Sequence, residues 1–423
     1  MGWRLSGLKE IAVIGSGISG LAAAYYLSRR HRVTLFEREA RLGGHTHTVQ
    51  VETPAGPVPV DTGFIVHNTR TYPNLVRLFQ ELGVPTVESD MSFSVRDSHS
   101  GFEYSSRGLR GFFAQRASLL RARQYALLKE VHRFNRAARR LLAHQGTEET
   151  TLDEFLGRER FSRAFTRDYL YPLASAIWST AIGQIGAFPA FTLIRFFENH
   201  GMLRLTRHVR WRTIPGGCSG YIEPLTAPYR ERILREAGIK NIERREQNVR
   251  LNFARGSAAE FDEVVLACSG NQALALLANP SEAERAVLGS FHTTANEAVL
   301  HTDSRLLPRT SWGRASWNCH LDGETTTGAP VTYHMNRLQA LPVAQDYCLT
   351  LNANGSVDRS KILRRFVYHH PLYTLEAVRA QGRWREISGR DRVHYCGAYW
   401  IYGFHEDGLN SATRVARALG VEC

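Results

Sequence analysis

Residues 11–37 read IAVIGSGISGLAAAYYLSRRHRVTLFE. The run Ile11–Ile14 is short and continuously apolar, as expected for a strand buried in a parallel sheet. A glycine-rich turn follows, then a helix-like segment over about residues 18–30 and a second strand-like run, Arg32–Phe36. This order predicts a strand–helix–strand unit at the start of an α/β domain.

The turn has the spacing G-x-G-x-x-G, in Gly15, Ser16, Gly17, Ile18, Ser19 and Gly20. The first glycine permits a tight turn, the second lets a pyrophosphate approach the backbone, and the third allows close helix–strand packing. Free N–H groups and the dipole at the helix N-terminus favour the phosphates. Glu37 ends the second strand, where a carboxylate would accept hydrogen bonds from a ribose diol. These residues predict a site for the ADP half of a dinucleotide.

A second glycine pair follows this acid and would give another backbone approach to the phosphate chain. With Glu37, the run Arg38-Glu39-Ala40-Arg41-Leu42-Gly43-Gly44 resembles the E-x-x-x-R-x-G-G signature of the superfamily of flavin amine oxidases, protoporphyrinogen oxidases and phytoene desaturases. The resemblance implies that the dinucleotide is a non-covalently bound FAD. It also implies cofactor contacts from Arg38, Gly43, Gly44, His45 and Thr46.

Two internal segments extend the resemblance. Val60–Ile65 is similar to the D-x-G segment that passes the flavin in relatives, which implies contacts from Gly63, Phe64 and Ile65. Residues 242–249 and 264–270 look like a pair of strands whose first member contacts adenine through the backbone of a valine, here Val249.

The end of the chain resembles the C-terminal FAD signature, in Tyr395–Gly397 and Gly408–Ala412. In relatives, the last helix points its N-terminus at the flavin N1/C2 edge, where reduced flavin carries negative charge that a helix N-terminus stabilises. The implied cofactor contacts are Gly397, Ala398, Gly408 and Leu409.

Within the superfamily, the chain resembles a bacterial subgroup often encoded beside cyclopropane-fatty-acid-synthase-like methyltransferases. This resemblance implies modification of lipid acyl chains, with a lipid methyltransferase as a partner. The chain departs from its relatives at His45, where they usually have arginine, and at Ala398, where they usually have an acid. Both changes weaken the implied contacts with the phosphate or ribityl chain. None of the four lysines lies in a matching motif, which argues against the lysine-assisted amine oxidation of many relatives.

The chain has 423 residues, too many for one usual hydrophobic core, so two domains are expected. Nucleotide-binding signals lie at both ends and in the middle. We therefore predict an α/β fold: a Rossmann-type, glutathione-reductase-like FAD domain built from the discontinuous segments 1–70, 215–290 and 385–423, and an α+β substrate-binding domain from 71–214 and 291–384. Residues 71–145 are predicted to be helical, 215–238 to be a glycine-rich turn leading into a helix, and 296–351 to contain strands.

Residues 169–194 carry no formal charge. The segment is long enough to span a bilayer, but Pro172, Pro189 and several polar residues make a continuous lipid-facing helix improbable. We interpret it as broken helices, which form either ordinary core or the wall of an apolar substrate channel.

The formal net charge is +13, and nearly all of the excess comes from arginine. Such a surface attracts phosphate-rich partners, although an arginine-rich genome would give the same composition. The basic segment Leu109–Leu142 is either a solvated helix face over a packed stripe or a surface that adheres to anionic lipid. No nucleic-acid reading module is recognisable.

Six scattered cysteines without metal-ligand spacing indicate reduced thiols and no metal site. Because a strand-like run already begins at Ile11, we expect no signal peptide and a cytoplasmic protein, with contact at the inner membrane face as an alternative.

The best ionisable candidates for proton transfer are His405, Glu406 and Asp407, immediately before the last helix, although they would equally serve to cap it. The polar run Tyr333–Arg337 is a second candidate for the substrate side. We predict an FAD-dependent oxidoreductase that moves a hydride from a lipophilic substrate to flavin N5, with desaturation of a fatty-acyl chain or similar lipid as the outcome. The alternatives are an amine oxidase acting on a small amine, a non-redox flavin isomerase, and an FAD-bearing assembly partner of a lipid methyltransferase.

Overall fold

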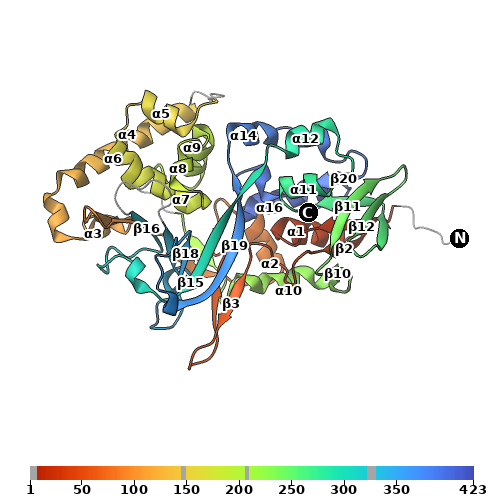
Figure 1. The fold of residues 1–423 in the computed structure, drawn as a ribbon, viewed down its shortest axis with the longest axis horizontal. Helices are drawn as coiled ribbons and strands as arrows, with labels where there is room; N and C mark the ends of the chain where they lie inside the picture. The colour runs from red at the N-terminus through yellow and green to blue at the C-terminus, as the bar shows by residue number, and fades with distance from the viewer. Residues whose placement is uncertain (1–6, 144–148, 205–208, 322–329) are drawn as a thin grey trace.

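The computed structural model describes residues 7–143, 149–204, 209–321 and 330–423. Figure 1 shows two halves: α1 and α16 lie in one, and the helices α3 to α9 lie at the far side of the other. Two large buried clusters of apolar side chains correspond to these halves.

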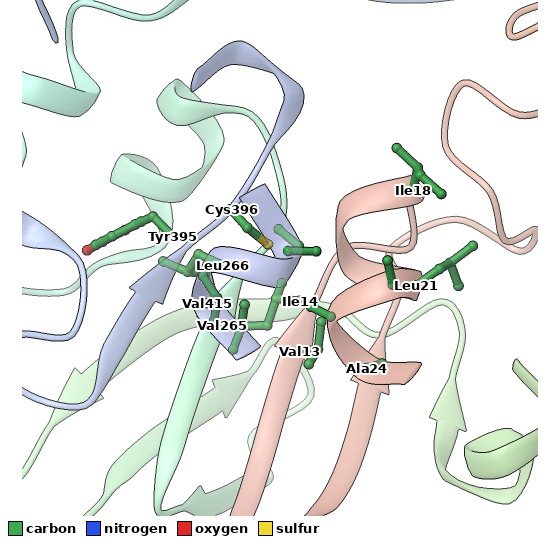
Figure 2. Close-up of a cluster of buried hydrophobic side chains, with 14 of the residues drawn as sticks. Val13, Ile14, Ile18, Leu21, Ala24, Val265, Leu266, Tyr395, Cys396 and Val415 are labelled. Atoms are coloured by element: carbon green, nitrogen blue, oxygen red, sulfur yellow. The ribbon is translucent and has the colours of Figure 1, made fainter. Parts of the chain in front are cut away.

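The first half is built on a parallel sheet with the strand order β10-β2-β1-β14-β20. Its strands come from separated parts of the chain: Ile233–Leu234, Arg32–Phe36, Glu10–Ile14, Glu263–Leu266 and Val393–Tyr395. The helices α1 (Ile18–Leu27) and α16 (His405–Ala418) pack against each other and against this sheet, as Figure 2 shows for Val13, Leu21 and Val415. The expected strand–helix–strand unit and the discontinuous Rossmann-type sheet are both confirmed.

The chain between β2 and β14 adds a small antiparallel sheet to this half. Its strands are β11 (Ile239–Arg244), β12 (Val249–Phe253) and β13 (Ala258–Phe261). The prediction of one strand over 242–249 was wrong, because residues 245–248 form the turn that joins β11 to β12.

The second half contains a seven-stranded sheet with the order β19-β15-β18-β17-β16-β7-β8. The strands are Ile362–Leu372, His292–His301, Cys348–Leu351, Val331–His334, Trp317–Leu321, Phe93–Asp97 and Glu103–Ser105. The expected strands within 296–351 are therefore confirmed. Two further small sheets join β3 (Thr48–Val51) to β4 (Val58–Asp61), and β9 (Trp211–Thr213) to β5 (His67–Asn68) and β6 (Val87–Ser89).

Helices cover one side of this half (Figure 1). They are α3 (Gly108–Phe112), η1 (Arg116–Leu120), α4 (Ala122–Ala143), α5 (Leu152–Arg158), α6 (Arg163–Phe165), η2 (Thr166–Leu170), α7 (Tyr171–Trp178), α8 (Ile182–Ile185) and α9 (Ala190–Asn199). The uncharged segment is thus broken into short helices, and Ser179 takes a left-handed conformation after α7 (φ 52°). Within the described ranges, no helix combines the length and apolar character needed to cross a bilayer.

The helical prediction for 71–145 was wrong over its first part. After α2 (Pro73–Glu81) the chain forms β6, β7 and β8, because Phe93–Asp97 pairs with β16 and is largely buried. The predicted helix up to residue 238 is also broken. It divides into η3 (Cys218–Tyr221), α10 (Ile222–Thr226) and η4 (Ala227–Arg232), and then the chain enters β10. Pro224 and Pro228 lie in this region and lack the N–H that a continuous helix requires.

The buried clusters do not follow the predicted domain boundaries at every point. Side chains of α2, including Leu75 and Phe79, belong to the cluster around the parallel sheet, although the prediction assigned them to the substrate domain. Val58 and Val60, in the predicted FAD segment, belong to the other cluster.

Candidate cofactor and substrate site

The glycine turn after β1 has separate structural and binding positions. Gly15 has φ +103°, and a Cβ on Gly20 would lie 1.8 Å from the Gly15 carbonyl oxygen, so both positions require glycine for the fold itself. A Cβ on Gly17, by contrast, would meet nothing within 4 Å. Gly17 therefore leaves free space beside the N-terminus of α1, where a phosphate chain would pass.

Three donors hold the carboxylate of Glu37 at the edge of this turn. Ser16 donates to Oε2 from its backbone N at 2.8 Å and from its Oγ at 2.5 Å, and the backbone N of Glu39 donates to Oε1 at 2.8 Å. The remaining lone pairs are available to a ribose diol, as the sequence predicts.

The second glycine pair faces the first. A Cβ on Gly44 would lie 3.0 Å from Gly17 Cα, and the backbone N of Gly43 donates to the Ser16 carbonyl at 3.0 Å. Gly63 is packed so closely on the next segment that a Cβ would lie 1.9 Å from the His45 carbonyl oxygen. These contacts join three separate loops into one continuous wall.

The wall encloses a cavity of about 1750 Å³ that runs from the dinucleotide cradle into the second half of the molecule. Of the residues predicted to hold the cofactor, those that line it are Gly15, Ser16, Gly17, Ile18, Ser19, Glu37, Arg38, Gly43, Gly44, His45, Gly63, Phe64, Ile65, Gly397 and Ala398. Fifteen of the twenty predicted cofactor residues therefore line the cavity.

The other predicted cofactor residues lie behind the wall. A Cβ on Gly408 would lie 2.8 Å from both Ile18 Cγ2 and Ser19 Oγ, so this glycine allows α16 to pack closely on α1. Leu409 is fully buried in the same core, and Gly20 has the packing role described above. Thr46 is buried, and its Oγ1 lies 2.9 Å from His405 Nε2.

Val249 is not among the residues that line the cavity, and the adenine contact through its backbone stays a prediction. It is fully buried in β12, where it pairs with Arg244 and Phe261. The segment 237–240 lines the cavity instead, and the backbone N of Ala237 donates to the Glu37 carbonyl at 2.8 Å.

Of the three predicted proton-transfer residues, only His405 lines the cavity. Glu406 caps α2: its carboxylate accepts from the backbone N of Asn74 at 3.0 Å and of Leu75 at 2.9 Å. Asp407 caps its own helix by accepting from the backbone N of Phe404 at 2.9 Å, and burial raises its pKa to about 7. Both acids thus have the capping role that the sequence also allowed, and a catalytic role for them stays a prediction.

His405 lies between the two halves of the site. Its ring stacks on Phe64 with centroids 3.5 Å apart, and its Nε2 lies 2.9 Å from Thr46 Oγ1, which also contacts the Tyr221 hydroxyl at 2.6 Å. Burial holds the pKa of His405 well below its usual range, so the imidazole is neutral at physiological pH.

Asp61, within the D-x-G segment, has a structural role. Its carboxylate accepts from the Cys218 backbone N at 2.9 Å and from Thr48 Oγ1 at 2.5 Å, and burial raises its pKa to about 6. These bonds fix the β3–β4 hairpin to the loop that begins η3. The glycines 216 and 217 of that loop both have positive φ.

In the second half of the molecule, the cavity is lined mainly by apolar and aromatic side chains, together with the charged Glu88, Asp90 and Arg107. The uncharged segment contributes Tyr169, Leu173, Ala176, Ile177, Trp178 and Ser179, and other elements contribute Met91, Phe93, Tyr104, Phe196, Trp317 and Tyr333. Part of the uncharged segment thus forms the wall of an apolar arm, while Leu193 and Ile194 are ordinary core. In the polar run 333–337, only Tyr333 lines the cavity, and His334 contacts Asp346 at 3.0 Å.

A group of imidazoles in the wall was missed by sequence reasoning. His369 and His370 of β19 line the cavity, and the His370 ring lies 5.1 Å from that of His45. Burial lowers the pKa of His370 to about 3 and that of His45 to about 4. Asn296 Nδ2 lies 3.0 Å from His370 Nδ1. Two consecutive histidines in a strand give no sequence signal of a place in the cavity wall. Only the fold brings β19 near the loop of Gly44 and His45.

The lysines lie away from the arm. Lys240 is the one lysine among the residues that line the cavity, and it belongs to the 237–240 segment beside Glu37. Lys9 instead pairs with Glu263 at 2.6 Å.

The chain is similar to known flavin-containing proteins. A family model described as "Flavin containing amine oxidoreductase" matches residues 18–420. A Mycobacterium tuberculosis protein that carries the name flavin-containing monoamine oxidase AofH is 27% identical over 263 residues, covering 59% of this chain and 54% of AofH. YgfK of Escherichia coli, named as an oxidoreductase, is 48% identical over 58 residues. The chain spans 6% of YgfK and about half of AofH.

Solved structures share the whole fold. A redesigned putrescine oxidase superposes with a TM-score of 0.70 at 12% identity, covering 97% of this chain and 99% of that chain. A CLA-producing fatty acid isomerase from P. acnes superposes with a TM-score of 0.69 at 17% identity, covering 98% of this chain and 99% of that chain. The α/β architecture is therefore shared with this putrescine oxidase and this fatty acid isomerase.

Proposed function

Because the chain belongs to the flavin-containing amine oxidoreductase family, we propose that it is an enzyme that desaturates a fatty-acyl chain or a similar lipid. It is an FAD-dependent oxidoreductase, and the open space at Gly17, the oriented Glu37 carboxylate and the facing glycine pairs fit that cofactor. When bound, FAD supplies a hydride acceptor at N5. We take the cofactor to be held non-covalently, by the backbone of these loops.

The apolar arm of the cavity is the observation that carries the proposal. It is continuous with the cofactor cradle, and the six residues of 169–179 that line it carry no charge. An acyl chain would bury apolar surface along Leu173, Ile177 and Trp178, and its presence would exclude water from the reacting carbon.

Desaturation removes a proton as well as a hydride, and the proton needs an acceptor. His405, His370 and His200 line the cavity, and burial lowers the pKa of each, so their imidazoles are neutral near pH 7. A neutral imidazole can accept a proton if it reaches the substrate carbon. His405 is the first candidate, because it lies where the arm meets the cradle.

The substrate class draws further support from two resemblances. The chain resembles the subgroup encoded beside cyclopropane-fatty-acid-synthase-like methyltransferases, and the isomerase from P. acnes with the same fold is named for a fatty acid. Methylated or unsaturated acyl lipids are therefore the first substrates to try. A lipid methyltransferase that produces such a chain is the proposed partner, and co-purification of the two proteins tests it.

Oxidation of a small amine is a second candidate. AofH and putrescine oxidase are both named for amines, and two carboxylates, Glu88 and Asp90, line the cavity and would attract an ammonium group. Hydrogen bonds from Ser92 lower the pKa of Asp90, so this acid stays charged. Against this candidate, the arm is apolar and no lysine lies in it.

Anaerobic titration distinguishes these possibilities. Holoenzyme is mixed with acyl lipids or with amines, and the visible absorbance band of oxidised FAD is followed. Bleaching by an unsaturated or methylated acyl lipid supports desaturation. Bleaching by amines alone, with peroxide release in air, supports amine oxidation. Double-bond migration that requires pre-reduced flavin supports isomerisation. If no lipid bleaches the band, desaturation is refuted.

A matched pair of variants tests the arm. Ala176 lines it and is 1% exposed, so Ala176→Phe would fill the space that an acyl chain needs. Ala187 is exposed between α8 and α9, and Ala187→Phe is the control. We expect Ala176→Phe to slow flavin reduction by long-chain lipids about tenfold or more, with FAD affinity and melting temperature retained. Equal rates in both variants would refute the assignment of the arm.

A further inference from the structure

Exposed apolar side chains gather on one surface of the molecule. Large apolar residues with substantial exposure are few in the described chain, and most of them occur here. This surface, which we call the α3–α4 surface, consists of Leu109, Leu119, Leu120, Tyr125, Leu128 and Trp312. The exposed fraction of Leu120 is 92% and that of Leu109 is 76%.

Contacts link the elements that carry these residues, and the rings of Phe113, after α3, and Tyr125, in α4, lie 5.7 Å apart. The Arg107 and Arg110 guanidinium carbons lie 5.3 and 5.4 Å from the centre of the Trp312 ring. The Tyr125 hydroxyl donates to the Leu119 carbonyl at 2.8 Å, which joins η1 to the start of α4. Figure 1 places α3 and the start of α4 at the end of the molecule farthest from the parallel sheet.

The charge around this patch is one-sided. Between Glu103 and Glu130 the sequence contains six basic residues and no acidic one. Arg123 is satisfied internally by Asp168 at 2.7 Å, whereas Arg110 and Lys129 lie on the outside with the leucines. An apolar patch rimmed by cations complements an anionic bilayer, which takes up leucines and attracts arginine and lysine. A second copy of this chain, docked on the same surface, would place basic residues against basic residues. It therefore matches the surface less well than an anionic bilayer does.

The α3–α4 surface also adjoins the cavity. Tyr104, Ser106 and Arg107 line the cavity and lead directly into α3. Arg107 is thus shared between the two: it lies over Trp312 on one side and forms part of the cavity wall on the other. A lipid held in the bilayer would reach the arm beside this residue.

We propose that the α3–α4 surface docks the protein on an anionic membrane, with Leu109, Leu119 and Leu120 inserted among the acyl chains. The docking delivers a membrane lipid to the apolar arm, and this part rests on the proposed function. The segment lies in the interface and does not span the bilayer.

Co-sedimentation of the holoenzyme with vesicles tests the docking. The vesicles contain either a mixture of phosphatidylglycerol and phosphatidylcholine or phosphatidylcholine alone. We expect binding to the anionic vesicles that high salt weakens, and much weaker binding to the neutral ones. Leu120→Ser and Leu109→Ser should each lower the partition coefficient about tenfold, because each removes one inserted leucine.

Leu234→Ser is the matched control. Leu234 is 50% exposed on β10, in the other half of the molecule, so its loss should leave vesicle binding unchanged. Equal binding of wild type, Leu120→Ser and Leu234→Ser overturns the proposal, as does an absence of binding to anionic vesicles. If light scattering shows that the wild type is a dimer and that Leu120→Ser is a monomer, the surface is assigned to contact with a second copy of the chain. That result would also overturn the proposal of membrane docking.

Flavin reduction separates this proposal from the proposed function. Leu120 does not line the cavity, so Leu120→Ser should reduce flavin normally with lipid presented in detergent micelles and slowly with lipid in vesicles. If wild type binds vesicles but no lipid reduces its flavin, the docking stands and desaturation fails. If micellar lipid reduces the flavin but Leu120→Ser and wild type respond alike to vesicles, docking fails and desaturation stands.

Discussion

Substitution of two glycines in one turn should have opposite consequences. Gly17 has φ −66° and ψ 174°, which alanine adopts freely, and its Cβ would meet nothing within 4 Å. Gly17→Ala should therefore fold with an unchanged melting temperature. The added methyl group occupies the space that the phosphate chain needs, so FAD binding should weaken. In Gly20→Ala, the Cβ would lie 1.8 Å from the Gly15 carbonyl oxygen, and the fold itself should suffer.

The magnitudes follow from these contacts. A methyl group that moves the phosphate away from one backbone N–H removes a hydrogen bond to a charged group, worth about 1.5–3 kcal/mol. The dissociation constant of FAD should then rise roughly 10- to 100-fold in Gly17→Ala. In Gly20→Ala, α1 must move away from β1, at a cost of about 3 kcal/mol or more in the free energy of unfolding.

Two measurements check this pair. Chemical unfolding of the apoprotein gives the stability of each variant, and titration with FAD, followed by flavin fluorescence, gives the affinity. Gly157→Ala is the control, because Gly157 lies exposed in α5 and its Cβ would also meet open space. Wild-type FAD affinity in Gly17→Ala would refute the placement of the phosphates. Loss of stability in Gly17→Ala would refute the conclusion that the space beside Gly17 accommodates a methyl group.

Three further changes test other parts of the site. Glu37→Gln should raise the dissociation constant of FAD about tenfold without unfolding the protein, and the same titration measures this. An unchanged dissociation constant would refute the contact between Glu37 and the ribose. Glu406→Ala should cost about 1–2 kcal/mol of stability by uncapping α2, while flavin reduction persists; complete loss of reduction in a folded variant would support Glu406 as a catalytic residue. Burial lowers the pKa of His45, His200 and His301 to about 4, so the unfolded chain binds more protons than the folded one below about pH 6.5. Their contribution to stability should be complete above that pH and lost as the pH falls toward 4, partly offset by Asp61 and Asp407, whose raised pKa values act in the opposite direction. Urea unfolding at a series of pH values measures this, and stability that rises on acidification would contradict it.

Local sequence was enough to locate the cofactor cradle. The turn from Gly15 to Gly20, the acid at Glu37 and the pair at Gly43 and Gly44 depend on backbone requirements that only glycine or a strand-end carboxylate meets. These requirements act within a few residues, so their spacing alone predicts them. The prediction of one strand over 242–249 failed, because the position of a hairpin turn depends on how the flanking strands pair.

The roles of ionisable residues depended on tertiary packing. Glu406 and Asp407 look equivalent in sequence, yet one caps α2, more than 300 residues away, and the other caps its own helix. His370 carries no motif, and it enters the wall only because β19 lies against the loop of His45.

The amino-acid sequence by itself predicted the binding of a dinucleotide. The glycine spacing meets a steric requirement of the turn and its phosphate site, and this requirement does not depend on distant parts of the chain. Only the tertiary structure decided which acids are structural, which imidazoles face the cavity and where the exposed leucines gather. Those properties arise from burial and from contacts between distant segments. A linear pattern does not encode which two surfaces will meet.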